Sequence, residues 1–130
     1  MGLIEAYKAL KDISYRVSNS NKLVEVVTVD EGHVMICKGD TCFELQKPEQ
    51  IGKELVIPVL KWSKPMLRLR RRGDKYEIME RKYITLSDLN YFMNTYDFRD
   101  FTKRMKNIKE VENDISRLYK FFDYLYTMFI

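Results

Sequence analysis

The sequence predicts an α+β domain: an N-terminal helix, an antiparallel sheet of about five or six strands, and C-terminal helices that carry an apolar a/d seam. Three observations lead to this fold class. Apolar residues recur at helical spacing near the N-terminus, β-branched runs between turn residues fill the middle, and a helical period returns at the end. A length of 130 residues suits one domain with one added element. We therefore expect an α+β domain over 1–106 and a separate C-terminal helix over 107–130.

Apolar side chains at spacings of three and four residues mark one face of the first helix. They are Leu3, Tyr7, Leu10, Ile13 and Val17. The polar run 18–21 ends this helix, because Ser and Asn side chains compete for backbone hydrogen bonds. The β-branched run 22–29 predicts a first strand, and a turn over 30–32 leads into a second strand that begins at His33.

Gly39-Asp40 is typical of a two-residue hairpin loop and predicts a third strand over 41–45. This register places Cys37 opposite Cys42, at a position where cross-strand side chains come closest. A disulfide is then within reach, and two reduced core thiols are the alternative. Disulfides inside cells are unusual outside hyperthermophiles. Proteins of hyperthermophiles are rich in lysine and glutamate and poor in glutamine, and this chain has the same composition, with two glutamines. A zinc site from both cysteines and His33 would lack a ligand, so neither metal nor cofactor is expected.

Residues 54–62 predict a further strand, and Pro58 favours a sheet edge for it because proline has no amide donor. After a break at 63–65, residues 66–72 and 75–84 predict a second hairpin around Gly73-Asp74.

Positive charge is concentrated in this second hairpin. Residues 61–84 carry nine Lys or Arg against three Asp or Glu, whereas the rest of the chain is nearly balanced. Aromatic residues lie among these cations, and that combination is typical of surfaces that bind single-stranded nucleic acid, with cations on phosphates and bases stacked on rings. The candidate binding residues are Trp62, Lys64, Arg68, Arg70, Arg71, Arg72, Lys75, Tyr76, Arg81 and Tyr83. The alternative is a basic block that only solvates exposed strands.

Thr85 and Asp88 have the spacing of a capping box and predict a helix start. Beyond it, seven apolar residues alternate spacings of three and four, which is an a/d seam. They are Ile108, Val111, Ile115, Leu118, Phe122, Leu125 and Phe129. The segment after Leu118 is apolar on nearly every side, which favours homodimerisation through this helix over packing within the chain. The alternative function is therefore a protein-interaction or assembly module that uses this helix and binds no nucleic acid.

Several function classes are not expected. The sequence has one histidine, no P-loop and no GxGxxG motif, so an enzyme with a small-molecule substrate is not indicated. No apolar run approaches the roughly 18 residues of a membrane span, and no signal-peptide pattern is present. We expect a cytoplasmic protein whose partners are single-stranded DNA or RNA and a second copy of itself.

The arrangement of a basic, aromatic-bearing sheet segment over 61–84 followed by the helical seam over 108–129 resembles the ThermoDBP family. These are single-stranded-DNA-binding proteins of hyperthermophilic archaea. The resemblance is one of architecture and implies a dimer with a basic-rimmed, aromatic-lined cleft for single-stranded DNA.

Overall fold

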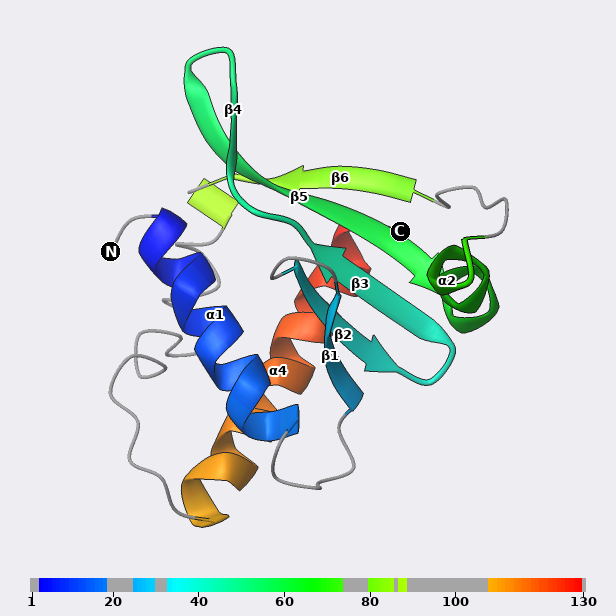
Figure 1. Ribbon diagram of the computed structural model, residues 1–130. Helices are drawn as coiled ribbons and strands as arrows, with labels where there is room; N and C mark the ends of the chain where they lie inside the picture. The colour runs from blue at the N-terminus through cyan, green and yellow to red at the C-terminus, as the bar shows by residue number, and fades with distance from the viewer. Residues whose placement is uncertain are drawn as a thin grey trace.

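Two helices cover one face of an antiparallel sheet, and a third, short helix lies against the other face (Figure 1). The computed structural model describes residues 3–18, 25–29, 33–73, 80–85, 87–88 and 108–129. The helices are α1 (Leu3–Ser18), α2 (Lys64–Arg71) and α4 (Ile108–Met128). The strands are β1 (Glu25–Val29), β2 (His33–Lys38), β3 (Thr41–Leu45), β4 (Glu49–Ile51), β5 (Glu54–Ser63) and β6 (Glu80–Ile84). The predicted α+β class is confirmed.

The hairpin predicted around Gly39-Asp40 is confirmed. β2 and β3 are joined by the turn Gly39-Asp40, and Cys37 stands opposite Cys42. Gly39 has a φ of 63°, a left-handed conformation that favours glycine because it has no Cβ atom. The strands follow the order β1-β2-β3-β5-β4, and β6 pairs with β5.

β5 lies inside the sheet, which corrects the edge position expected from Pro58. β3 and β6 both pair with β5 along the residues that flank this proline. The Pro58 carbonyl accepts a hydrogen bond of 2.9 Å from the Gln46 amide. In an antiparallel pair the amide and carbonyl of one residue face the same neighbouring strand. The donor that proline lacks therefore falls just beyond Leu45, where β3 has already ended.

The larger core lies between the sheet and the pair α1 and α4. Phe43 of β3 is fully buried, and its ring centroid lies 5.0 Å from that of Phe122 and 5.3 Å from that of Phe129. From α1, Leu10 reaches the same cluster without solvent exposure, as does Leu125 from α4. Each such buried side chain contributes about 1.5–3 kcal/mol of transfer free energy. The two helices are therefore part of the sheet's own core.

From Ile115 to Phe129 the a/d seam of α4 packs inside the chain, which corrects the prediction of a dimer interface there. Leu118, Phe122, Leu125 and Phe129 are at most 6% exposed and belong to the core formed with the sheet. Ile115 packs partly buried against the same core, and the side chains of Ile108 and Val111 lie outside the described part of the molecule. The described part of the seam is covered within one chain and is therefore not available to a second copy. The sheet needed an apolar cover, and α4 supplies it.

Three lysines on different strands hold the aromatic end of α4. The ammonium groups of Lys38 and Lys61 lie over rings of this helix, and that of Lys82 lies over Phe129, which follows the helix; the distances to the ring centroids are 5.1 to 5.8 Å. Such contacts attract a cation to the face of the ring. Lys38 also pairs with Asp123 at 3.2 Å, and Lys82 donates to the carbonyl of Met128. These lysines thus fasten the helix to the sheet.

The predicted capping box at Thr85 is confirmed. The Thr85 amide donates to the Asp88 carboxylate at 3.0 Å, and the Asp88 amide donates to the Thr85 hydroxyl at 3.2 Å. These reciprocal bonds satisfy two amides that a helix start leaves without partners. None of the helices in the described ranges is long and apolar enough to cross a membrane.

Tyr7 joins α1 to the sheet through a buried hydroxyl. It is 4% exposed, and its hydroxyl donates to the carbonyl of Leu45 at 3.2 Å. Burial raises the pKa of Tyr7 from 10.0 to about 12. The folded state therefore holds this proton more tightly than the unfolded state does. The stabilisation is complete below pH 10 and is lost as the pH rises toward 12.

We expect Tyr7→Phe to lower the free energy of unfolding by about 1 kcal/mol at neutral pH, through loss of one buried hydrogen bond. Above pH 10 the wild-type protein should lose stability faster than this variant. The unfolded wild type ionises Tyr7 while the folded state keeps the proton, whereas phenylalanine has no proton to lose. Urea unfolding of both proteins at pH 7, 9 and 11 measures the difference. A stability difference that does not shrink by pH 11 would contradict the assigned role of the buried hydroxyl.

Candidate nucleic-acid interface

Residues 64–71 form helix α2, so the predicted strand over 66–72 is wrong. The Ser63 hydroxyl accepts a hydrogen bond of 3.3 Å from the Met66 amide and caps the helix. Pro65 lies in the first turn, where an amide has no helical partner to lose. The alternating leucines and arginines that follow imitate the period of a strand. The serine cap and the proline that precede them favour a helix start instead.

The predicted hairpin around Gly73-Asp74 is therefore also wrong in its pairing. β6 takes β5 as its partner, with Arg81 opposite Leu60 and Tyr83 opposite Pro58. In the described residues, the positive charge of 61–84 is consequently distributed over β5, α2 with its C-cap, and β6.

The structure separates the predicted binding residues into exposed and buried groups. Arg68 of α2 and Arg72, the C-cap residue of this helix, are exposed, and Lys64 is half-buried. The side chain of Arg70 is only 16% exposed, and Trp62 is 1% exposed. Trp62 thus has no free ring face, which corrects its predicted role of stacking on bases. The side chain of Arg71 and the whole of Lys75 and Tyr76 lie outside the described residues.

Arg81 and Tyr83 lie on the sheet face that α2 covers. Paired residues of an antiparallel ladder point to the same face, so Arg81 shares the face of Leu60. Leu60 packs in the smaller core with Trp62 and with Leu67 of α2. Since side chains alternate along a strand, Tyr83 lies on this face as well. The structure therefore brings two exposed arginines, from α2 and its C-cap, and two exposed residues of β6 to one side of the sheet.

Beneath α2 lies a carboxylate with no solvent exposure, which belongs to Glu44 of β3. The Trp62 indole donates to its Oε1 atom at 3.1 Å, and the side-chain amide of Gln46 donates to Oε2 at 3.0 Å. Arg70 donates to Oε1, and the Nδ1 atom of His33 lies 3.2 Å from Oε2. A buried carboxylate is costly unless it is paired and hydrogen-bonded. Here partners from β2, β5, α2 and the chain after β3 surround it.

Arg70 has two contacts that fix α2 on the sheet. Besides its bond to Glu44, its guanidinium lies over the Trp62 ring, 5.2 Å from the centroid. A planar guanidinium both stacks on an aromatic face and pairs with a carboxylate, which lysine does less well. Arg70 is therefore a structural residue in this surface, and the exposed arginines of α2 depend on it for their position.

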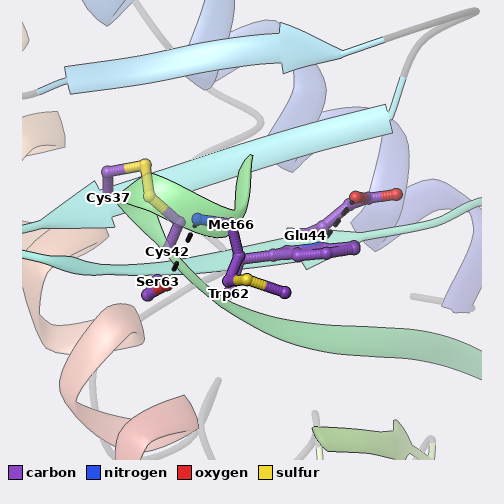
Figure 2. The surroundings of a disulfide bond; sticks show 6 residues. All are labelled: Cys37, Cys42, Glu44, Trp62, Ser63 and Met66. Carbon is purple, nitrogen blue, oxygen red and sulfur yellow. Dashed lines mark hydrogen bonds between the residues drawn. A yellow bond between two sulfur atoms is a disulfide. The ribbon is translucent and has the colours of Figure 1, made fainter. Parts of the chain in front are cut away.

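Cys37 and Cys42 form a disulfide bond next to this polar cluster (Figure 2). Of the two states left open by the sequence, the structure has the bonded one. Figure 2 shows Met66 of α2 beside the Trp62 ring, and Cys42 is the cross-strand partner of Trp62. Cys37 and Cys42 are buried, at 3% and 0% exposure. The disulfide, the indole ring and α2 thus form one packed unit.

Sequence reasoning missed Glu44, although a signal for it was present. In the confirmed hairpin register, Glu44 faces Met35 on one side and Leu60 on the other. A carboxylate between two apolar residues in the middle of a sheet indicates a buried charge that needs cationic partners. The arginine that pairs with Glu44 could not be identified from the sequence, because residues 68–72 include four arginines.

The chain was compared with protein-family models, curated proteins and solved structures, and none of these comparisons found a match.

We expect Glu44→Gln to lower the free energy of unfolding by about 3 kcal/mol or more, because Arg70 would lose its carboxylate while remaining largely buried. Urea unfolding measures the loss. Glu54→Gln, at an exposed position of β5, is the matched control and should change stability by less than about 0.5 kcal/mol. A small effect of Glu44→Gln would mean that the carboxylate does not hold α2.

We expect the purified protein to resist alkylation at both cysteines until it is reduced, which mass spectrometry detects. Reduction should lower the free energy of unfolding by about 2 kcal/mol, a value at the low end for disulfides because the closed loop is short. A Cys37→Ala, Cys42→Ala variant is the control, and its stability should not respond to reductant. Rapid alkylation without reductant would show that the thiols are free.

Proposed function

We propose that this chain binds single-stranded nucleic acid, DNA before RNA, with little sequence preference, through one side of the sheet. The binding surface consists of Arg68 of α2, the C-cap residue Arg72, and Arg81 and Tyr83 of β6, and we name it the arginine face. The observation that carries the proposal is that these three exposed arginines share a side of the sheet with an exposed tyrosine. Tyr83 is 39% exposed.

The chemistry of these groups suits a flexible phosphate chain. A guanidinium offers a fork of donors that matches phosphate oxygens, and three of them supply an attraction that tracks the backbone. No ion pair within the described ranges neutralises Arg68, Arg72 or Arg81. A tyrosine ring stacks on any base, for about 1–3 kcal/mol, and so adds affinity without sequence preference. Duplex DNA keeps its bases stacked and would gain only the phosphate contacts.

The resemblance to the ThermoDBP family implies the same class of ligand. It also implies a dimer, and any such dimer would need a surface other than the seam of α4, which the chain's own sheet covers. The burial of Leu118, Phe122, Leu125 and Phe129 disfavours the alternative function, a protein-interaction module built on that helix. Among its large apolar side chains in the described region, Tyr126 is the exposed one, at 43%.

We expect Arg68→Ala, Arg72→Ala, Arg81→Ala to weaken binding of a labelled single-stranded oligonucleotide and to flatten its salt dependence. Each lost phosphate contact lowers the salt slope by about 0.7, so the triple variant should lose about 2. Fluorescence anisotropy at several salt concentrations measures both quantities, with duplex DNA and RNA of the same sequence as comparison ligands. The matched control is Lys8→Ala, Lys11→Ala, Lys47→Ala, which also removes three positive charges but lies on α1 and the segment after β3.

The two triple variants distinguish a local site from a general effect of charge. Loss of slope in the arginine variant alone supports the arginine face. Equal losses in both variants, or binding that prefers the duplex, would contradict the proposal.

We expect Tyr83→Ala to weaken binding of single strands by about tenfold, which corresponds to one lost stacking contact. Tyr83→Phe is the conservative control and should keep the affinity, because the ring remains. Since Tyr83 is exposed, neither change should affect folding, and a thermal melt of each variant verifies this. Loss of affinity in both variants would assign the effect to the hydroxyl and exclude stacking.

A further inference from the structure

A cavity of about 260 Å³ lies between the beginning of α1 and the segment that joins β3 to β4. Ile4, Tyr7, Lys8 and Lys11 line it from α1, and Lys47 and Pro48 line it from the connecting segment. The fold and the arginine face do not depend on it. Its volume is slightly below the range of about 300–1,000 Å³ that is common for ligand sites. It therefore suits a compact ligand.

Three of the residues that line the cavity are lysines. Lys8 and Lys11 are three residues apart on a helix and so project from the same side of it, and Lys47 comes from the other wall. Within the described residues none of these three lysines has an ion pair. Glu5 and Asp12, the acidic residues of α1, are not among the residues that line the cavity. Three ammonium groups around one opening attract an anion of more than one charge.

The interior of the cavity is apolar and held in place. Ile4 is 47% exposed and brings an aliphatic side chain to the lining. Tyr7 contributes its ring, while its hydroxyl is occupied by the Leu45 carbonyl. Pro48 has a fixed φ angle and forms the opposite wall. The lining thus combines apolar surface from Ile4, Tyr7 and Pro48 with donors from three lysines.

We infer that this cavity binds a small phosphate monoester whose organic part is compact and apolar or aromatic. A phosphate monoester carries between one and two negative charges near neutral pH and has three acceptor oxygens. These match three lysine ammonium groups better than the single charge of a carboxylate does. The organic part packs against Ile4, the Tyr7 ring and Pro48. This site lies on α1, on the helix-covered side of the sheet, and its occupation does not require nucleic-acid binding.

Phenyl phosphate is the probe for the test, and amide NMR shifts of the full chain during a titration are the readout. We expect saturable shifts at the start of α1 and around Lys47 and Pro48. Lys8→Ala, Lys11→Ala, Lys47→Ala should weaken binding at least tenfold, and Ile4→Ser should weaken it several-fold. The variant Arg68→Ala, Arg72→Ala, Arg81→Ala is the matched control and should bind the probe as the wild type does.

Two further probes test the assigned ligand class. Inorganic phosphate lacks the organic part and should bind more weakly than phenyl phosphate. Benzoate lacks the second charge and should also bind more weakly. Equal binding of either one, shifts that do not saturate, or an unchanged affinity in the lysine variant would overturn the inference. Failure of this site leaves the arginine face untouched, because the two triple variants share no residue.

Discussion

The buried carboxylate of Glu44 is the contact on which the arrangement of the second sheet face depends. It joins the indole of β5, the guanidinium of α2 and the imidazole of β2 at one point. Removing a charged partner from water is unfavourable, so each of these groups has its lowest free energy only where the others are present. These contacts fix the position of the Trp62 ring and the position of α2 on the sheet. Buried polar networks of this kind specify one arrangement more sharply than apolar packing does.

The two faces of the sheet are stabilised by different means. On the face of α1 and α4, large apolar clusters supply the free energy, and lysines at the rim lie over aromatic rings. On the other face a small cluster of six buried residues is reinforced by the disulfide and the Glu44 network. A short helix such as α2 gains little stability from its own backbone bonds. Its contacts with the sheet are what keep its exposed arginines in a constant position.

Much of the fold is predictable from the sequence because its signals are local. The β2–β3 turn needs glycine at a left-handed φ, and the Cys37–Cys42 pairing follows from the turn. The helical periods of α1 and α4 and the capping box at Thr85 are local in the same sense. Pro58 misled because its effect depends on where the neighbouring strand ends, and that is a tertiary property.

The candidate site was predictable only in part. The concentration of positive charge at 61–84 is visible in the sequence, but the alternation Leu67-Arg68-Leu69-Arg70 fits a strand as well as a helix. Which arginine is exposed depends on Glu44, a residue that follows the hairpin loop by only a few positions. The packing partner of the α4 seam was ambiguous for a similar reason, since an apolar helix face can pack against its own chain or against a second one. The lysine-lined cavity combines residues of α1 with two residues about forty positions later, and no sequence pattern predicts it.

The place of Trp62 has a spectroscopic consequence. It is the chain's single tryptophan, and its cross-strand neighbour Cys42 is half of the disulfide. An excited indole transfers an electron readily to a disulfide at close range, and this process competes with light emission. The oxidised protein should consequently fluoresce weakly under excitation selective for tryptophan, and brighten when the sulfur–sulfur bond is cleaved. Release of α2 would add a shift of the emission to longer wavelength as water reaches the ring. The molecule therefore carries an intrinsic optical reporter that separates a change in its redox state from a change in its helix packing.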